Sequence, residues 1–386
     1  MVDQIGHPFG QRNDPGGPGV TIAVDAMGGD YGPTEVVPGA LDHARSHPTD
    51  SLLLVGDETT IRTIGGELPA NVEIVHASEV IGMDEHPALA LREKKDSTIL
   101  VATDLVRRGR ADAVVTAGHT GAGMAAAVLR LGRLPGVDRP ALAVQMTTDA
   151  GPMVLLDIGA NPDSTPENLA QFARMGAIFA EQVLRVSGPR VALLSIGEEK
   201  GKGDARIQRA TELLDETDLN FVGNVEGKDL TRHMADVVVC DAVLGNVVIK
   251  FFEGLSTFIF DLFRREFRGS LRGRLAYLLM APGVARIRNV FDYERAGGSP
   301  LLGVRGTVII THGRARRRMI AYGVGVAATM ARTKVPDLIG AAFAPAAKVG
   351  TPPPVDGPPR DRPQSDVPPS DVPPNDVPAP TLESAS

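Results

Sequence analysis

Short runs of apolar, β-branched residues recur along the chain and alternate with longer stretches in which apolar residues return every three or four positions. The short runs predict buried strands, and the longer stretches predict amphipathic helices. The expected strands are 21–25, 52–55, 113–116, 154–157, 191–195, 237–240 and 307–310, and the expected helices are 34–45, 98–108, 166–184, 205–214 and 314–331. This alternation predicts an α/β fold, with a mostly parallel sheet and helices on both faces.

The two ends of the chain have a different composition. Residues 1–19 are rich in Gly and Pro and lack the apolar core of a secretory signal. Residues 344–386 repeat an Asp-Val-Pro pattern, which favours extended conformations and buries too little apolar surface to fold. We expect a disordered leader, a catalytic α/β domain over 20–343 and a disordered tail. The tail is either a recruitment segment or an inert extension.

Composition excludes several classes of protein. The formal net charge is −7, and aromatic residues make up 4% of the chain with no Trp, so nucleic acid is not an expected partner. The single cysteine, Cys240, cannot form an intrachain disulfide and fits a reducing compartment. Since no run reaches about 18 uninterrupted apolar residues, we expect a soluble cytoplasmic protein.

Ligands of parallel sheets collect at the carboxyl ends of the strands, and small polar residues gather there in this chain. Asp25, Gly28 and Gly29 follow the first expected strand, as an anion-binding turn or as a tight turn that Asp25 caps. The segment Gly118-His119-Thr120-Gly121 opens an apolar helix, whose N–H groups and dipole attract a phosphate or an oxyanion. His119 is a general acid, an anion donor or a turn residue.

Three further strand ends carry candidate residues. Asn161 either binds substrate or satisfies the backbone of its turn. Lys200 and Lys202 lie in a glycine-rich loop that is an anion clamp or merely a solvated surface. Asn246 stands where a strand gives way to a helix, and Cys240 in the preceding apolar run is expected to be an inert buried thiol.

Several well-known motifs are missing from the sequence. The glycines do not follow the dinucleotide fingerprint, the lysine loop does not fit a Walker A motif, and the G-x-S-x-G elbow is not found. No clustered Cys and His residues or calcium loop suggest a metal. We therefore expect neither a cofactor nor a metal.

Taken together, these five segments resemble the PlsX family of phosphate acyltransferases, over residues 20–343. Further matching segments are 139–142, 223–227, Gly303 and His312-Gly313. The resemblance implies a fold similar to isocitrate dehydrogenase and phosphotransacetylase, and a homodimer. It also implies transfer of a fatty acyl group from acyl carrier protein to inorganic phosphate, which makes acyl phosphate for phospholipid synthesis. The family usually has Asn where this chain has His119, and Gly-Phe where it has Ala242-Val243-Leu244.

The implied reaction needs no protein nucleophile, because phosphate is already an oxyanion. The enzyme then contributes positioning and charge stabilisation. We expect Lys200 and Lys202 to hold phosphate, Asn246 to donate to the thioester oxygen and Asn161 to orient one anion. The remaining substrate-binding candidates are Asp25, Gly28, Gly29, Gly118, His119, Thr120, Gly121, Lys250 and His312.

The helical stretch from Lys250 onward is apolar on one face and ends in a basic block. Phe258 and Leu262 belong to the apolar face, and Arg264, Arg265 and Arg268 follow. This pattern suits an anionic membrane or the acidic carrier protein, and the alternative is a core or dimer face. The product is consumed by a membrane glycerol-3-phosphate acyltransferase, so the resemblance implies peripheral association with the inner face of the membrane.

Three rival functions remain. A phosphotransacetylase-like enzyme would use a coenzyme A thioester, and thioester preference would distinguish it. An NAD-dependent dehydrogenase of similar fold is disfavoured by the missing nucleotide fingerprint. A non-catalytic scaffold that binds carrier protein is disfavoured by Lys200, Lys202 and Asn246 in their anion-binding loops.

Overall fold

A computed structural model describes residues 18–148, 150–290 and 292–344, without the side chains of 288–290 and 293. The segments expected to be disordered fall outside these residues, except for 18–19 and 344. The predicted domain boundaries therefore stay a prediction.

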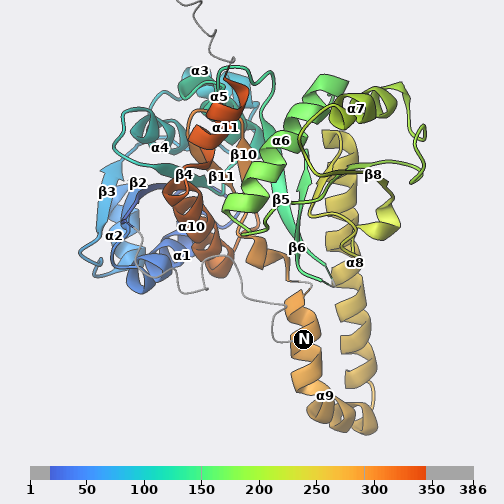
Figure 1. Ribbon diagram of the computed structural model, residues 1–386. Coiled ribbons are helices and arrows are strands. Elements are labelled where there is room, and N and C mark those ends of the chain that lie inside the picture. Colours follow the sequence, from blue (N-terminus) through green and yellow to red (C-terminus); the bar gives the residue numbers. More distant parts are fainter. Residues whose placement is uncertain (1–17, 149, 291, 345–386) are drawn as a thin grey trace, which may run out of the picture. The chain divides into compact units, whose positions relative to one another are not determined.

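Within the described residues, eleven strands form one sheet in the order β3-β2-β1-β4-β11-β10-β5-β6-β9-β7-β8 (Figure 1). The strands are β1 (Thr21–Asp25), β2 (Ser51–Gly56), β3 (Val72–His76), β4 (Ala113–Thr116), β5 (Ala141–Thr147), β6 (Pro152–Leu156), β7 (Val191–Leu194), β8 (Phe221–Val225), β9 (Val237–Val239), β10 (Ser299–Leu302) and β11 (Thr307–Ile310).

Parallel pairing occurs in two blocks of the sheet. The first block is β3-β2-β1-β4-β11, and the second is β6-β9-β7-β8. Between them, β10 pairs antiparallel with β11 and β5, and β5 pairs antiparallel with β6. The predicted mostly parallel sheet is confirmed, while the antiparallel centre was not foreseen.

Helices cover both faces of the sheet, as predicted. They are α1 (Pro33–Ser46), α2 (Glu58–Gly65), α3 (Pro87–Glu93), α4 (Thr98–Arg107), α5 (Thr120–Arg130), α6 (Pro166–Gln182), α7 (Ala205–Asp215), α8 (Ala242–Arg268), α9 (Leu271–Val290), α10 (Arg317–Arg332) and α11 (Val335–Phe343). Ile22 and Val24 of β1 pack in one core cluster with residues of α1 and α10, which Figure 1 shows side by side. Ala23 points to the other face and packs with α4.

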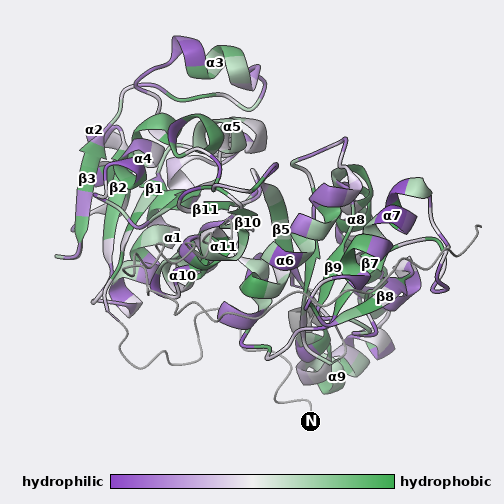
Figure 2. Cartoon of the chain, turned by 45° about the horizontal axis from the view of Figure 1, so that its top comes forward, coloured by the Kyte–Doolittle hydropathy of each residue, from purple (hydrophilic) through white to green (hydrophobic). Residues whose placement is uncertain are grey.

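The hydrophobic interior follows the strands. Figure 2 shows the strands largely in the colour of hydrophobic residues, whereas most helices carry both colours. All four residues of β4 and of β7 are buried, which a strand covered on both faces requires. The loops at the strand ends are consequently the places where polar groups become accessible.

Candidate functional site

The loops after β1 and β4 interlock at the carboxyl edge of the first block. Asp25 and Thr116 end adjacent parallel strands in register, and the Thr116 hydroxyl donates to Asp25 Oδ2 at 2.7 Å. A Cβ on Gly28 would lie 2.7 Å from the Gly118 amide nitrogen, so only glycine permits this approach. The structure thus brings Asp25 and Gly28 together with the glycine-rich segment that opens α5.

His119 caps α5 through its ring. Its Nδ1 accepts from the Gly121 amide at 3.0 Å, so the neutral ring carries its proton on Nε2 and can donate there. The Gly118 amide donates to Thr116 Oγ1 at 3.0 Å, so two of the amides expected to hold an anion are engaged internally. The amides of His119 and Thr120 have no hydrogen-bond partner within the described part of the chain.

His312 joins the same edge through the loop after β11. β11 lies beside β4, and the Asp30 amide donates to the Gly313 carbonyl at 2.8 Å. Gly29, at φ +92°, lies against the same carbonyl. Three strand-end loops of the first block therefore meet at one place.

Helix α8 of the second block reaches this place. Asn246, Lys250 and Glu253 are spaced by four and three residues, so they share one face of α8. Lys250 Nζ lies 3.0 Å from His312 Nε2 and 3.0 Å from Glu253 Oε2. A lysine and a histidine that are 62 residues apart in sequence thus meet between the two blocks.

The ring of His312 is oriented by the backbone. Its Nδ1 accepts from the Arg314 amide at 3.2 Å, which leaves the proton of the neutral ring on Nε2. Burial, and next the Lys250 ammonium, lower the pKa of His312. Lys250 Nζ and His312 Nε2, 3.0 Å apart, therefore both carry N–H groups at this place, a combination that suits an anionic ligand.

Asn161 is engaged by the protein itself. It is 7% exposed, and its Nδ2 donates to the Pro140 carbonyl at 2.7 Å and to Asp157 Oδ2 at 2.8 Å. Burial raises the pKa of Asp157, against hydrogen bonds from Ala160, Gly159 and Asn161 that lower it. Both amide hydrogens of Asn161 are used to hold this loop, so its predicted catalytic role has no donor free in this structure and stays a prediction.

The two lysines after β7 differ in their surroundings. Lys200 has a side chain 78% exposed and pairs with Asp215, the last residue of α7, at 3.0 Å. Lys202 is exposed and makes no ion pair within the described residues. Asn246 is also exposed, and no hydrogen bond of its amide side chain is found in the described part of the chain. Lys202 and Asn246 are thus available to a ligand, whereas Lys200 first has to leave Asp215.

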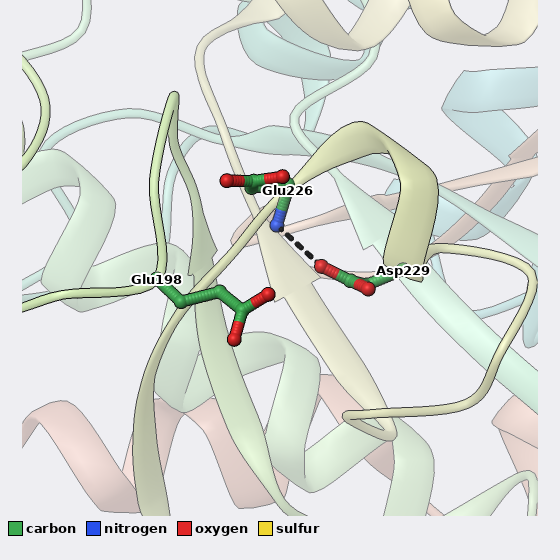
Figure 3. Close-up of side chains that lie close together, drawn as sticks. All are labelled: Glu198, Glu226 and Asp229. Carbon is green, nitrogen blue, oxygen red and sulfur yellow. Dashed lines mark hydrogen bonds between the residues drawn. The ribbon is translucent and has the colours of Figure 1, made fainter.

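A cluster of three carboxylates lies beside the lysine loop. Figure 3 shows Glu198, Glu226 and Asp229, with the Glu226 amide donating to Asp229 at 3.1 Å. Lys228 Nζ lies 2.6 Å from Glu226 and 3.1 Å from Glu198, and these contacts raise the pKa of Lys228. Because an ammonium group already serves two of the carboxylates, the cluster gives no support for a metal, and the expected absence of one stays a prediction.

Sequence reasoning missed three polar residues of this region. Glu253 could have been found, because it lies on the helical face that Lys250 occupies. Thr116 needed the register of β1 and β4. Arg206, which pairs at 2.8 Å with Asp241 at the start of α8, had no sequence signal.

The outer part of α8 exposes the residues predicted to contact a membrane or carrier protein. Phe258 is 58% and Leu262 50% exposed, and Arg264, Arg265 and Arg268 are exposed as well. Helix α9, which was not predicted, lies beside α8 and adds further exposed apolar residues: Leu271, Leu275, Leu278, Leu279 and Met280.

Among the described residues, α8 is also the one helix long and apolar enough to span a membrane, by length and composition alone. Its first turns pack on the core through Val248, Ile249 and Phe252. We therefore treat α8 as a surface helix with an exposed outer half.

Comparisons with known proteins decide the family. Residues 20–338 match the family described as "Fatty acid synthesis protein". The phosphate acyltransferase of Desulfitobacterium hafniense (strain Y51) is 48% identical over 309 residues, which cover 79% of this chain and 92% of that protein. The chain belongs to the PlsX family of phosphate acyltransferases. The Myxococcus xanthus phosphate acyltransferase is 46% identical over 316 residues, covering 80% of this chain and 90% of that protein. The predicted family and its acyltransferase class are confirmed.

Solved structures support the fold of this PlsX-family chain. The EutD phosphotransacetylase from Staphylococcus aureus superposes with a TM-score of 0.54 at 16% identity, covering 83% of this chain and 96% of that one. A phosphotransacetylase from Streptococcus pyogenes gives 0.54 at 17% identity, with 81% and 94% covered. These likenesses confirm the phosphotransacetylase-like architecture and extend no further than the fold.

Proposed function

We propose that this chain transfers a fatty acyl group from acyl carrier protein to inorganic phosphate and so supplies acyl phosphate for phospholipid synthesis. The observation that carries the proposal is the contact between Lys250 and His312 at 3.0 Å. It brings the face of α8 that carries Lys250 to the loop after β11, which itself contacts the loop after β1. The relatives named phosphate acyltransferase support the choice of phosphate as acceptor.

In the proposed reaction a phosphate oxygen attacks the thioester carbonyl carbon, a C–O bond forms, and the C–S bond breaks. The thiolate leaves with the bonding pair and later takes a proton from water. The thiol of Cys240 is fully buried, and burial raises its pKa well above the usual value, so it does not compete as a nucleophile. Phosphate itself is the nucleophile.

Phosphate binding is assigned to the start of α5. The unpartnered amides of His119 and Thr120 are joined there by the Nε2–H of His119. Backbone N–H groups at a helix N-terminus are suited to anions, because the helix dipole adds to their hydrogen bonds. Lys202 of the lysine loop makes no ion pair within the described residues, and we keep it as a phosphate ligand, as the sequence predicted.

Lys250 and His312 are assigned to the thioester. Their converging donors stabilise the oxygen of the carbonyl as it becomes an oxyanion, and Asn246 lies one turn away on the same face. Losing one preorganised donor of this kind costs about 10²–10³ in rate. Removal of Lys250 is therefore expected to lower kcat more strongly than removal of Asn246, whose side chain makes no bond within the described structure.

A turnover assay tests the proposal. Purified protein would be mixed with palmitoyl-acyl carrier protein and inorganic phosphate, and acyl phosphate would be trapped with hydroxylamine. Phosphate-dependent release of free carrier is expected. Activity with acyl coenzyme A alone would support the phosphotransacetylase-like alternative instead. The absence of activity with both thioesters would favour a scaffold that binds carrier protein.

We further propose a cytoplasmic homodimer that associates peripherally with the inner face of the membrane. The exposed apolar residues of α8 and α9 and the arginines at the end of α8 support this placement. An apolar surface of this extent is normally covered by a partner or a lipid surface. The neighbouring membrane enzyme would be the glycerol-3-phosphate acyltransferase that consumes acyl phosphate.

A further inference from the structure

Two buried polar residues lie beneath the proposed phosphate subsite without reaching it. Thr116 is 1% exposed and Asp25 is 2% exposed, at the ends of neighbouring strands. The Thr116 hydroxyl has a single hydrogen, which it donates to Asp25 Oδ2. The oxygen of the same hydroxyl accepts from the Gly118 amide. The carboxyl group, the hydroxyl and the amide therefore form a directed relay.

The relay continues into the first turn of α5. With the Gly118 amide bound to Thr116 and the Gly121 amide bound to the His119 ring, the amides between them, of His119 and Thr120, have no partner within the described residues. Gly118, two residues before the helix begins, is packed against Gly28, which admits no side chain. The backbone that leads into these two amides is therefore held by Thr116 and Gly28.

Asp25 also has an unused oxygen. Its Oδ1 lacks a hydrogen-bond partner, and the residue lines a cavity of about 10 Å³ together with Thr98, Gly118 and His119. Burial raises the pKa of Asp25, against hydrogen bonds from Thr98 and Thr116 that lower it. A shift in this direction favours the neutral carboxyl group, which repels an anion less than a carboxylate does.

We infer that Asp25 and Thr116 are positioning residues of the phosphate subsite, which act through the Gly118 amide and never touch the ligand. The inference rests on the proposed function and specifies how its phosphate subsite is held in place. It replaces direct substrate binding by Asp25 with an indirect role, and it makes the amides of His119 and Thr120 the donors that bind inorganic phosphate.

Two phosphate groups in this reaction could occupy the subsite. One is inorganic phosphate, and the other is the phosphodiester on the prosthetic arm of acyl carrier protein. The inference commits to inorganic phosphate, because the acceptor has to be held firmly enough to attack. Separate Michaelis constants for the two substrates distinguish the sources.

The decisive variant is Thr116→Val, which keeps the shape of the side chain and removes the hydroxyl. We expect the KM for phosphate to rise at least about tenfold, because a misplaced amide loses about one hydrogen bond to the charged phosphate. The KM for palmitoyl-acyl carrier protein is expected to stay near the wild-type value, and Thr116→Ser is expected to restore phosphate binding. An unchanged KM for phosphate, or a rise confined to the carrier protein, would overturn the inference.

A second pair of variants covers the case in which Thr116→Val does not fold. Asp25→Asn keeps an acceptor for the Thr116 hydroxyl, whereas Asp25→Ala removes it. The relay predicts that Asp25→Ala weakens the binding of phosphate and that Asp25→Asn does not. Equal loss in Asp25→Asn and Asp25→Ala would contradict the relay, because a ligand-binding carboxylate would be needed to explain it.

Calorimetric titration of inorganic phosphate, with no acyl donor present, separates this inference from the proposed function. One outcome is that the wild-type protein binds phosphate but turns over no thioester, and that Thr116→Val no longer binds phosphate. The relay then stands and the proposed acyl transfer fails. If the wild-type protein makes acyl phosphate and Thr116→Val binds phosphate equally well, the acyl transfer stands and the relay fails.

Discussion

His119 combines two hydrogen-bonding roles in one side chain. The ring accepts from the Gly121 amide through Nδ1, which leaves Nε2 as a donor. The amide of an asparagine offers the same pair, with an oxygen to cap the helix and a nitrogen to donate. This equivalence explains how His119 can serve in place of the Asn that the resemblance to the family led us to expect.

We therefore expect His119→Asn to retain most of the turnover and His119→Ala to lose it. Loss of the cap should also lower the free energy of unfolding of His119→Ala by about 1 kcal/mol. Urea titration and the hydroxylamine assay together check this expectation. A fully active His119→Ala would show that the ring serves neither role.

His312 predicts a pH dependence. Its pKa is lowered, by burial first and next by Lys250, so the ring is already neutral at a pH where an ordinary histidine is half protonated. As the pH falls through that lowered pKa, Nδ1 becomes protonated and can no longer accept from the Arg314 amide, so the ring loses the bond that orients it. A second positive charge also appears beside Lys250. Glu253 and Asp30 raise the pKa of His312 and Arg314 lowers it further.

Wild-type kcat should accordingly fall on the acid side, below pH 6.5, and His312→Asn should lack this decline although its rate is lower. Phosphate titrates in both proteins, so the comparison of the two profiles isolates the histidine. Identical acid limbs would argue against the assignment.

At the level of the elements, α8 depends on one close contact. A Cβ on Gly245 would overlap the Asp157 carbonyl oxygen, whereas a Cβ on Gly254 of the same helix would meet nothing within 4 Å. Gly245→Ala should therefore displace the start of α8, lower the free energy of unfolding by roughly 1–3 kcal/mol and reduce activity.

Gly254→Ala is the matched control for this change. It should raise the free energy of unfolding by about 0.5–1 kcal/mol, because alanine is the better helix former. Denaturant titrations of both variants measure the difference. Equal stability of the two would contradict the packing of α8 on the loop after β6.

The basic end of α8 makes a separate prediction. Reversing the charges of Arg264 and Arg265 should release the protein from vesicles that contain anionic lipid, because their attraction depends on these charges. Flotation measures the effect. Charge reversal at Arg45 and Arg62, exposed arginines of α1 and α2, is the control and should leave flotation unchanged.

A rise in the KM for acyl carrier protein with unchanged flotation would instead assign Arg264 and Arg265 to the carrier.

The elements also show how far the sequence could be interpreted. Strands β1, β4 and β11 were predicted with their observed bounds, because they are short, buried and β-branched. β3 and β8, which end the sheet, were missed because polar or glycine residues interrupt their apolar runs: Glu73 in β3, and Gly223 with Asn224 in β8. α9 was missed because its apolar residues do not gather on one face.

The site was predicted as a set of motifs, without the contacts among them. Strand order places β11 beside β4, and only this order brings His312 to the loops after β1 and β4. Likewise, the pairing of Lys200 with Asp215 and the internal bonds of Asn161 depend on how loops close, which residue spacing does not determine.

For the molecule as a whole, the exposed apolar residues of α8 and α9 predict assembly. Such surfaces are rare on soluble monomers. Sedimentation equilibrium should give a mass near twice 40.6 kDa at micromolar concentration. Leu275→Glu combined with Leu279→Glu should shift the equilibrium toward the monomer if α9 is the contact. If the wild-type protein is monomeric at all concentrations, the homodimer is wrong and the apolar surface is assigned to lipid binding alone.

One continuous helix carries both Lys250 and Arg265, and this continuity has a geometric consequence. Fifteen residues at about 1.5 Å each separate them by roughly 22 Å along the axis. A surface held by Arg265 would thus stay at a set distance from the point where the thioester is cleaved. Acyl phosphate would then form within one helix length of the bilayer. Its fatty acyl chain would be exposed to water only over a short distance before it reached the next enzyme.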